Sequence, residues 1–397
     1  MTKKNDEKVL VEAGIAGAQS DEIIDGFNVD EDVELMKALS LSKEIKTSIL
    51  EVGNVGRQEI KTLVDLFYQM QDIRKALREQ IRSIEHDTDE GSSINVMILE
   101  WNLKNIGIIE NGIKKCLELV CQSDPVGRWL LSIVGMGPIL SAGLLAYLDV
   151  TGKNYASNFI SYAGLNDNNR PWLGAEKSKN LVNEVVGTAK TITDDMVVEI
   201  AAKSKWSYDY LRDNAYNQEK EKWSKTDLIK ACSKIPYNKK LKTLLYKCGS
   251  SWQWCCNKPN SLYGQLFNQR RVYETIKNEN GEYAAEAAKQ LANKNFSKST
   301  EAYKQYSQGK LPKAHITMRA MRWTEKIFLS HLFEEMYRVK YDKVPARYYA
   351  LEHVQGHHDE ILPEVPYTKV TGENDVKVAS SDGEYEAYVG AFFEGKK

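Results

Sequence analysis

The chain has 397 residues, a hydrophobic content of 42%, and 54 Lys and Arg side chains against 55 Asp and Glu. This is the composition of a globular protein of two or three domains, and its overall charge does not indicate a polyanionic partner. No apolar run approaches the ~20 residues that cross a bilayer, and no signal peptide is visible, so we expect a cytoplasmic protein with no membrane partner.

The six cysteines are the first candidates for disulfide or metal chemistry. None forms a CxxC pair, and the adjacent residues Cys255 and Cys256 are poorly arranged for a metal and unusual as a disulfide. We therefore expect reduced, buried thiols, no metal site and no cofactor.

Charge is unevenly distributed along the chain. Residues 1–34 contain ten acidic side chains and three lysines, whereas residues 225–250 contain seven lysines and one acid, Asp227. An acidic first segment and a basic later one cancel in the total, but the later one can still provide a local phosphate-binding face. The alternative is an ordinary solvated helix face.

Residues 40–124 have the pattern of two long amphipathic helices on either side of a polar turn, residues 87–93. The first apolar stripe contains Ile60, Leu63, Phe67, Met70, Ile73, Leu77 and Ile81, and the second contains Ile94, Met97, Trp101, Ile106, Ile109, Ile113, Cys116, Leu117 and Val120. This pattern predicts an antiparallel helical hairpin or coiled coil, through which we expect a homo-oligomer. The acidic residues 1–39 are predicted to form a flexible tail.

The stretch 127–165 interrupts an apolar helix with the sequence Gly-Met-Gly-Pro, residues 135–138. Glycine and proline at these positions are typical of a turn between two helices, the second starting at the proline. Gly135 and Gly137 leave backbone N–H groups uncovered at a helix N-terminus, which is a ready site for a phosphate. This is the arrangement of a helix-hairpin-helix motif, and the alternative is a tight turn in a helical core.

Further helices are predicted after this turn, and the fold class is all-α. The predicted helices cover residues 154–165, 191–202, 236–256, 261–278 and 314–341, with a polar loop at 166–172. Residues 125–345 are predicted to form one helix-hairpin-helix domain, and 346–397 an irregular tail. Lys239, Lys240 and Lys242 lie on the outer face of one helix and Arg319 and Arg322 on another, and we expect all five to extend the phosphate-binding surface.

These motifs resemble the C-terminal, serine-bearing domain of the insertion-sequence transposases with a DEDD RNase H-like domain, the family of the pilin-gene invertase and the bridge-RNA-guided recombinases. Residues 133–142 resemble that family's IPGIGPxxA-type hairpin, and residues 162–165 (YAGL) resemble its YxGL element. Residues 237–242 resemble its lysine–glycine–asparagine and arginine–leucine element without the glycine, and 314–326 its AxxAxxRK helix. The resemblance covers residues 40–340 and implies a coiled coil followed by a DNA-binding domain.

Two features depart from the family. Its RNase H-like domain precedes the coiled coil, and residues 1–39 contain no apolar strand ending in an aspartate, so we expect no two-metal carboxylate site from them. Its nucleophilic serine follows the YxGL element, but residues 166–174 contain no serine. Ser178, between Lys177 and Lys179, is the nearest catalytic candidate. The alternative is a solvated surface serine.

Two other kinds of site are weaker candidates. His353, His357 and His358 have a spacing that can bind a transition metal on a helix, although a polar loop is favoured. A hairpin followed by an acid also resembles base-excision glycosylases, with Asp149 and Asp167 as the candidate acids.

Three functions remain open on this evidence. The first is a transposase-related protein of a mobile element or phage that binds duplex DNA in transposition or recombination without its own RNase H-type site. A guide RNA is a further partner that the resemblance implies. The second is an active recombinase that uses Ser178 with carboxylates from a partner. The third is a helical structural or interaction protein of a phage, with a degenerate hairpin.

Overall fold

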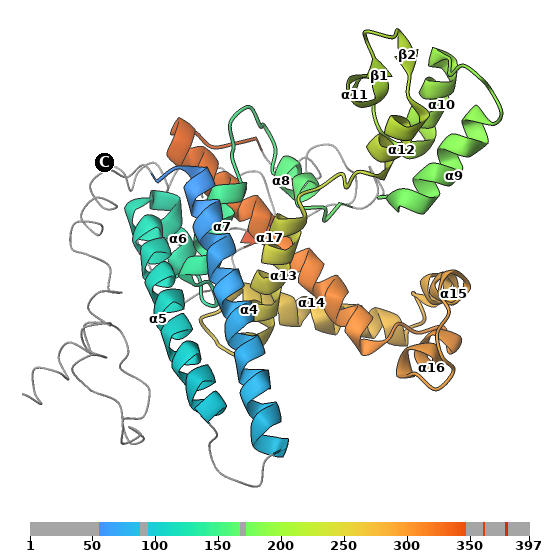
Figure 1. Cartoon of the computed structure of the whole chain (residues 1–397). Coiled ribbons are helices and arrows are strands. Elements are labelled where there is room, and N and C mark those ends of the chain that lie inside the picture. Colours follow the sequence, from blue (N-terminus) through green and yellow to red (C-terminus); the bar gives the residue numbers. More distant parts are fainter. Residues whose placement is uncertain (1–54, 88–93, 167–171, 347–359, 362–377, 380–397) are drawn as a thin grey trace, which may run out of the picture. The chain divides into compact units, whose positions relative to one another are not determined.

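The computed structural model describes residues 55–87, 94–166, 172–346, 360–361 and 378–379. Within these ranges the chain forms fourteen helices and two pairs of very short strands, so the predicted all-α fold is confirmed (Figure 1). β1 (Tyr216–Asn217) pairs antiparallel with β2 (Lys222–Trp223), and β3 (Glu360–Ile361) pairs antiparallel with β4 (Val378–Ala379). Among the described helices, none is both long enough and apolar enough to cross a bilayer.

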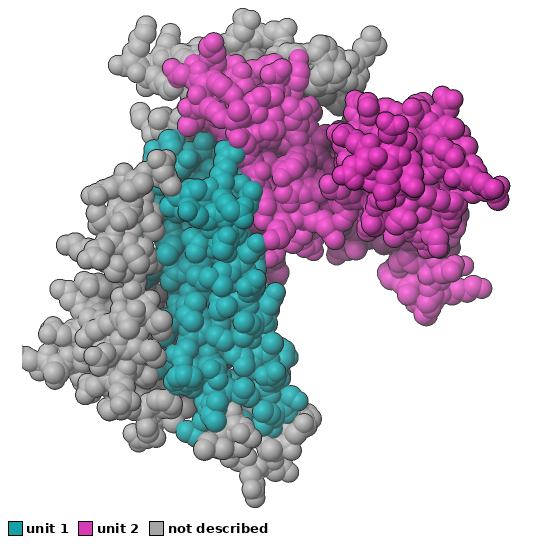
Figure 2. Space-filling view, turned by 45° about the horizontal axis from the view of Figure 1, so that its top comes forward, with its two compact units in different colours: residues 1–128, 137–146 teal, residues 129–136, 147–397 magenta. Residues whose placement is uncertain are grey.

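The chain divides into two compact units (Figure 2). The first comprises residues 1–128 and 137–146, and the second comprises residues 129–136 and 147–397. The predicted flexible tail, residues 1–39, lies outside the described residues, as does the predicted C-terminal tail apart from residue 346 and the β3–β4 pair.

The first unit is built on α4 (Arg57–Asp87) and α5 (Ile94–Ser123), which pack against each other (Figure 1). Both oxygens of the Glu110 carboxylate accept hydrogen bonds from the Arg74 guanidinium, at 2.5 and 3.1 Å. The next helix, α6 (Pro125–Ser132), starts where the sequence chemistry favours it: Pro125 opens it, and the Asp124 carboxylate accepts from the backbone N–H of Gly127 at 2.9 Å.

The apolar stripes of this unit are buried only in part. Ile60, Phe67, Ile113 and Leu117 are buried as predicted, and Val64 is buried although the stripe did not include it. The prediction was wrong for Ile73, Met97, Trp101 and Ile109, which are 44%, 39%, 44% and 39% exposed. For the three residues of α5, Met97, Trp101 and Ile109, the reason is that this helix is apolar around most of its circumference, whereas one neighbouring helix covers only one face.

The framework of the second unit consists of α8 (Ser157–Tyr162), α13 (Lys239–Trp254), α14 (Leu262–Glu279) and α17 (Lys313–Tyr341), with α17 packed against the other three. The rings of Trp252, Tyr263 and Phe328 join α13, α14 and α17, with centroids 4.8 to 5.3 Å apart. Close approach of α13 to α17 depends on Gly249, because a Cβ there would lie 2.4 Å from Met321 Cγ.

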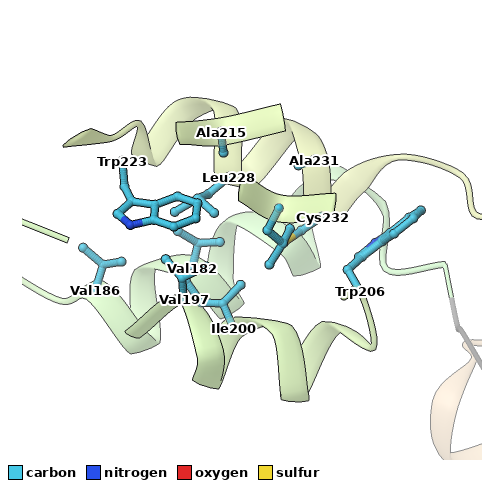
Figure 3. Packing of buried hydrophobic residues seen from close by; sticks show 11 residues of the cluster. Val182, Val186, Val197, Ile200, Trp206, Ala215, Trp223, Leu228, Ala231 and Cys232 are labelled. Atoms are coloured by element: carbon cyan, nitrogen blue, oxygen red, sulfur yellow. The ribbon is translucent and has the colours of Figure 1, made fainter. Parts of the chain in front are cut away.

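Residues 174–233 form a helical group with its own core (Figure 3). It contains α9 (Gly174–Val186), α10 (Asp194–Ser204), α11 (Tyr208–Ala215) and α12 (Lys225–Ser233), together with β1 and β2. Val182, Ile200 and Leu228 are fully buried at its centre. Of these helices the sequence indicated only α10, whose first turn is fixed by the Thr193 side chain accepting from the backbone N–H of Met196.

A second, smaller group consists of α15 (Ala284–Asn293) and α16 (Glu301–Ser307), which pack together between α14 and α17 in the chain. Its base is closed by one side chain: Asn278 donates to the carbonyl of Leu311 at 3.0 Å and accepts from its N–H at 2.7 Å. The single buried Asn278 therefore joins the chain that leads into α15 to the chain that leaves α16.

Candidate nucleic-acid interface

The predicted turn between two helices occupies residues 133–137. α6 ends at Ser132, and α7 (Pro138–Tyr147) begins at the expected proline. The turn is closed by a hydrogen bond from the Met136 N–H to the Ile133 carbonyl at 3.0 Å. Gly135 has a φ of +91°, a conformation that L side chains rarely adopt, so the backbone itself requires glycine here.

The two glycines of the turn have different surroundings. A Cβ on Gly135 would lie 3.1 Å from Ser251 Oγ and 3.3 Å from Trp252 Cδ1, and its carbonyl accepts from Ser251 Oγ at 2.6 Å. The absence of a side chain at Gly135 therefore lets the turn pack directly against α13. A Cβ on Gly137 would meet no atom within 4 Å, so nothing packs over this position.

The N-terminus of α7 follows directly after Gly137. The Ser141 N–H donates to the Gly137 carbonyl at 3.0 Å, which starts the helical hydrogen bonding. Pro138 has no N–H, so the amides of Ile139 and Leu140 are the ones that point out of the first turn, as in any helix, and carry the positive end of the helix dipole. Because Gly137 precedes α7 and is uncovered, an anion such as a DNA phosphate can approach the first turn of this helix.

Residues 162–165 and 237–242, which the resemblance picked out separately, are in direct contact. The Asn238 backbone N–H donates to the Tyr162 carbonyl, and its side chain donates to the Tyr162 hydroxyl, both at 2.9 Å. Lys242 Nζ donates to the Gly164 carbonyl at 3.0 Å. Gly164 has a φ of +68°, and a Cβ there would lie 2.5 Å from the Tyr237 ring, so this contact also requires glycine.

The three predicted lysines of α13 have unequal environments. Lys239 and Lys240 are exposed in the first turn, whereas Lys242 is half-buried between the Gly164 carbonyl and the ring of Tyr237, whose centroid is 4.4 Å from Nζ. Asn238 caps the helix by accepting from the Leu241 N–H at 3.0 Å. No acidic residue lies in this first turn, so lysine charge and the positive end of the helix dipole act at the same place.

The two predicted arginines of α17 also differ. Arg319 donates to Glu274 and to Glu286, each at 2.9 Å, and is thus already neutralised by carboxylates of the protein. Arg322 is exposed. Of the two, Arg322 has the environment expected of a residue that contacts DNA.

Glu274 is the centre of a buried charged network that links α14, α17 and the start of α15. It accepts from Arg270 at 2.8 Å, from Arg319, and from the hydroxyl of Tyr283. Burial acts to raise the pKa of Glu274, but the hydrogen bonds from Tyr283, Arg319 and Arg270 outweigh it and hold the pKa below its usual range. We interpret this network as structural, and Arg319 as one of its members rather than as a DNA-contacting residue.

His315 shares the Glu286 carboxylate with Arg319, at 3.3 Å, and its Nδ1 lies 3.2 Å from the hydroxyl of Tyr306. Burial and the nearby cations lower the pKa of His315 despite the attraction of Glu286. A histidine that is neutral at pH 7 adds little to a phosphate-binding charge.

Ser178 lies on α9 and is fully buried, so its interpretation as a solvated surface serine was wrong. The hydroxyl has no hydrogen-bond partner among the described residues. Lys177 and Lys179 are exposed, and residues adjacent in a helix do not face each other, so neither is placed to lower the pKa of this hydroxyl. Attack by Ser178 on a phosphate would require the 174–233 group to open.

The remaining sequence candidates are distributed as follows. Asp149 accepts from the N–H and the hydroxyl of Thr151, at 3.0 and 2.7 Å, and pairs with Lys340 at 3.4 Å. Asp167 and the three histidines at 353, 357 and 358 lie outside the described residues. Within the part of the chain that the structure describes, no group of His, Cys, Asp or Glu is arranged to hold a metal ion.

All six cysteines are free thiols, as predicted. Cys121, Cys232, Cys248 and Cys255 are buried, but Cys116 and Cys256 are only half-buried. Burial raises the pKa of Cys121 to about 12, which makes that thiol unreactive.

Sequence reasoning missed the residues that support the turn and the lysine helix. Ser251 and Trp252 could not be assigned to Gly135, because 116 residues separate the hydrogen-bonded pair. The role of Asn238 as the N-cap of α13 could have been predicted, since an asparagine before a run of lysines and leucines is typical of a helix start.

Comparison with known proteins adds no assignment: no protein-family model matches the chain, and neither curated proteins nor solved structures gave a significant match.

Proposed function

We propose that this chain is a DNA-binding protein of a mobile element or phage, related to the DEDD insertion-sequence transposases, that acts in transposition or recombination without an RNase H-type catalytic site of its own. The observation that carries the proposal is the turn before α7, where Gly135 is fixed by packing and Gly137 is left open beside the helix N-terminus. Its ligand in this proposal is a phosphate of duplex DNA.

The exposed cations of the same chain supply the rest of the binding charge in this proposal. Lys239, Lys240 and Arg322 are exposed and would contact phosphates, which fixes position on the duplex rather than reading its sequence. Sequence selectivity would then come from another component, and a guide RNA, as in the guided members of the family, is the candidate.

The test is duplex-DNA binding across a salt titration with a variant of Gly137. Gly137→Glu places a carboxylate in open space at the proposed phosphate site, so we expect folding to be retained and affinity to fall roughly tenfold or more. Binding by the native chain should weaken steeply with salt. Gly135→Glu is a poorer test, because its backbone and its contact with α13 both require glycine.

Gly107→Glu is the matched control. It makes the same change in charge at a helical glycine of α5 whose Cβ would also meet nothing within 4 Å. Equal loss of binding in both variants would mean that only net charge matters. Absence of DNA binding by the native chain would favour the third hypothesis, a structural protein with a degenerate hairpin.

The serine-recombinase alternative has a separate test. Ser178→Ala removes only the hydroxyl from a fully buried position, so folding should be unaffected. Loss of strand exchange in this variant, in a reaction that includes the partner supplying carboxylates, would support catalysis by Ser178. Unchanged strand exchange would exclude it.

A further inference from the structure

The outer face of α13 combines exposed aromatic rings with lysines. Trp254 is 88% exposed, which is unusual for so large an apolar side chain, and Tyr246 is 49% exposed. The helix contains four lysines and no acid. From this combination we infer that α13 binds an unpaired nucleic-acid strand, with Tyr246 and Trp254 stacking on bases and the exposed Lys239 and Lys240 contacting phosphates.

The two rings lie on one line of the helix. Residues 239, 243, 246, 250 and 254 follow each other at steps of three or four, so they fall within about 80° of the helix circumference. Tyr246 and Trp254 are two turns apart on this line, about 12 Å along the axis. The opposite side of α13, which includes Leu241, Leu245 and Trp252, is buried in the second unit and cannot take part in binding.

Two small side chains on this line, Thr243 before Tyr246 and Ser250 between the two rings, hydrogen-bond back to the helix backbone. Ser250 is four residues from each ring in sequence, and its hydroxyl donates to the Tyr246 carbonyl at 2.8 Å. The Thr243 hydroxyl does the same toward the Lys239 carbonyl at 3.1 Å. Because both side chains fold back onto their own helix, a base has access to the ring faces from along this line.

The charge pattern favours a nucleic-acid strand over a protein partner. Lysine is depleted at the centre of protein interfaces, whereas lysines interleaved with exposed aromatic rings are typical of surfaces that bind single strands. The strand must be unpaired, because stacking on Tyr246 and Trp254 needs a free base face, and in a duplex the neighbouring bases cover these faces. The inference deepens the proposed function, on which it rests, by adding single-stranded DNA or RNA to its ligands.

The charge of the first turn supports the same conclusion. Cations are unfavourable at a helix N-terminus, yet Lys239 and Lys240 occupy the first two positions of α13. A bound phosphate would offset both the lysine charges and the helix dipole. The strand would then run from this phosphate site past Tyr246 to Trp254.

The experiment measures binding of the full chain to fluorescein-labelled oligo(dT) and oligo(rU) by fluorescence anisotropy. Trp254→Ala should weaken binding roughly 5- to 150-fold, the range for loss of one stacked base, and Tyr246→Ala should have a similar effect. Trp254→Phe should retain most of the affinity, because it keeps a ring. Both oligonucleotides should bind, since stacking does not involve the 2′-hydroxyl.

Gln253→Ala is the control, because it truncates the exposed side chain next to Trp254 without removing a ring. Equal affinity of the native chain and Trp254→Ala would overturn the inference, as would failure of either oligonucleotide to bind. Trp254-dependent binding to vesicles of anionic phospholipid, without oligonucleotide binding, would overturn it in favour of a lipid surface. Failure of the Gly137→Glu duplex experiment would be a separate result, since it concerns another ligand and another residue.

Discussion

At the scale of single residues, Gly249 determines how closely α13 and α17 approach. An added Cβ would lie 2.4 Å from Met321 Cγ and 2.8 Å from Glu325 Oε1, distances that real Cβ atoms do not show. We expect Gly249→Ala to lower the free energy of unfolding by about 1–3 kcal/mol through overpacking. Gly107→Ala, where a Cβ meets nothing, should raise it by up to about 1 kcal/mol. Thermal melts of both variants check these opposite signs.

Glu325 is a second residue whose environment gives a testable consequence. Burial raises the pKa of Glu325 to about 8, against the attraction of Arg322 and Lys242. Because the folded pKa lies above the unfolded one, the stability that the proton provides is complete below about pH 4.5. It is lost progressively as the pH rises toward 8.

Glu325→Gln should remove this loss, because the amide has nearly the shape of the protonated acid but does not ionise. We expect equal melting temperatures of native chain and variant at pH 5, and a growing advantage of the variant up to pH 8 that levels off above it. Melts at intervals from pH 5 to 9 measure the difference. A constant difference across this range would show that the pKa of Glu325 is not raised in the folded state.

At the scale of elements, the Glu274 network holds α15 and α16 to the longer helices. Glu274→Gln leaves Arg270 and Arg319 without their shared carboxylate, and the cost should be below the ~3–5 kcal/mol of a fully buried pair, because both arginines are partly exposed and Arg319 keeps Glu286. We expect faster amide hydrogen exchange in residues 284–307. Glu282→Gln is the control, because its solvent-exposed pair with Lys277 adds little to stability. Similar exchange in the two variants would mean that the network does not anchor these helices.

The same scale shows what the sequence could predict. The 314–341 helix appears as α17, starting one residue earlier, because a long periodic pattern specifies a helix without reference to its neighbours. The 174–233 group was not predicted, because its core is assembled from helices of only 8 to 13 residues, which are too short to show a clear periodic pattern. Ser178 illustrates the limit: it shares a four-residue interval with Val182 and Val186, which are buried, but its charged neighbours resemble a surface.

The candidate site was predictable to a similar extent. The turn at 133–137 and its glycines could be located from sequence, because the backbone conformation there needs glycine locally. The difference between Lys242, which holds Gly164, and Lys239, which is exposed, could not be predicted. It depends on a contact between segments more than 70 residues apart.

At the scale of the whole molecule, the exposed apolar residues of α5 bear on self-association. Met97, Ile98 and Trp101 are 39%, 52% and 44% exposed and fall on one side of the helix, at intervals of one, three and four residues. A helix that is apolar beyond the face covered by its neighbour favours contact with a further partner. The predicted homo-oligomer would supply it, with the same face of α5 from each copy forming a two-fold interface.

This predicts that the full chain is a dimer at micromolar concentration and that Ile98→Glu or Trp101→Glu converts it to a monomer. A buried, unpaired carboxylate at the centre of an interface is strongly unfavourable, whereas the same side chain is harmless on an exposed helix. Light scattering coupled to size-exclusion chromatography measures the mass, and circular dichroism checks that helicity is unchanged. Val198→Glu, at a 54% exposed valine of α10, is the control and should remain dimeric. A monomeric native chain would mean that the exposed face of α5 does not mediate self-association.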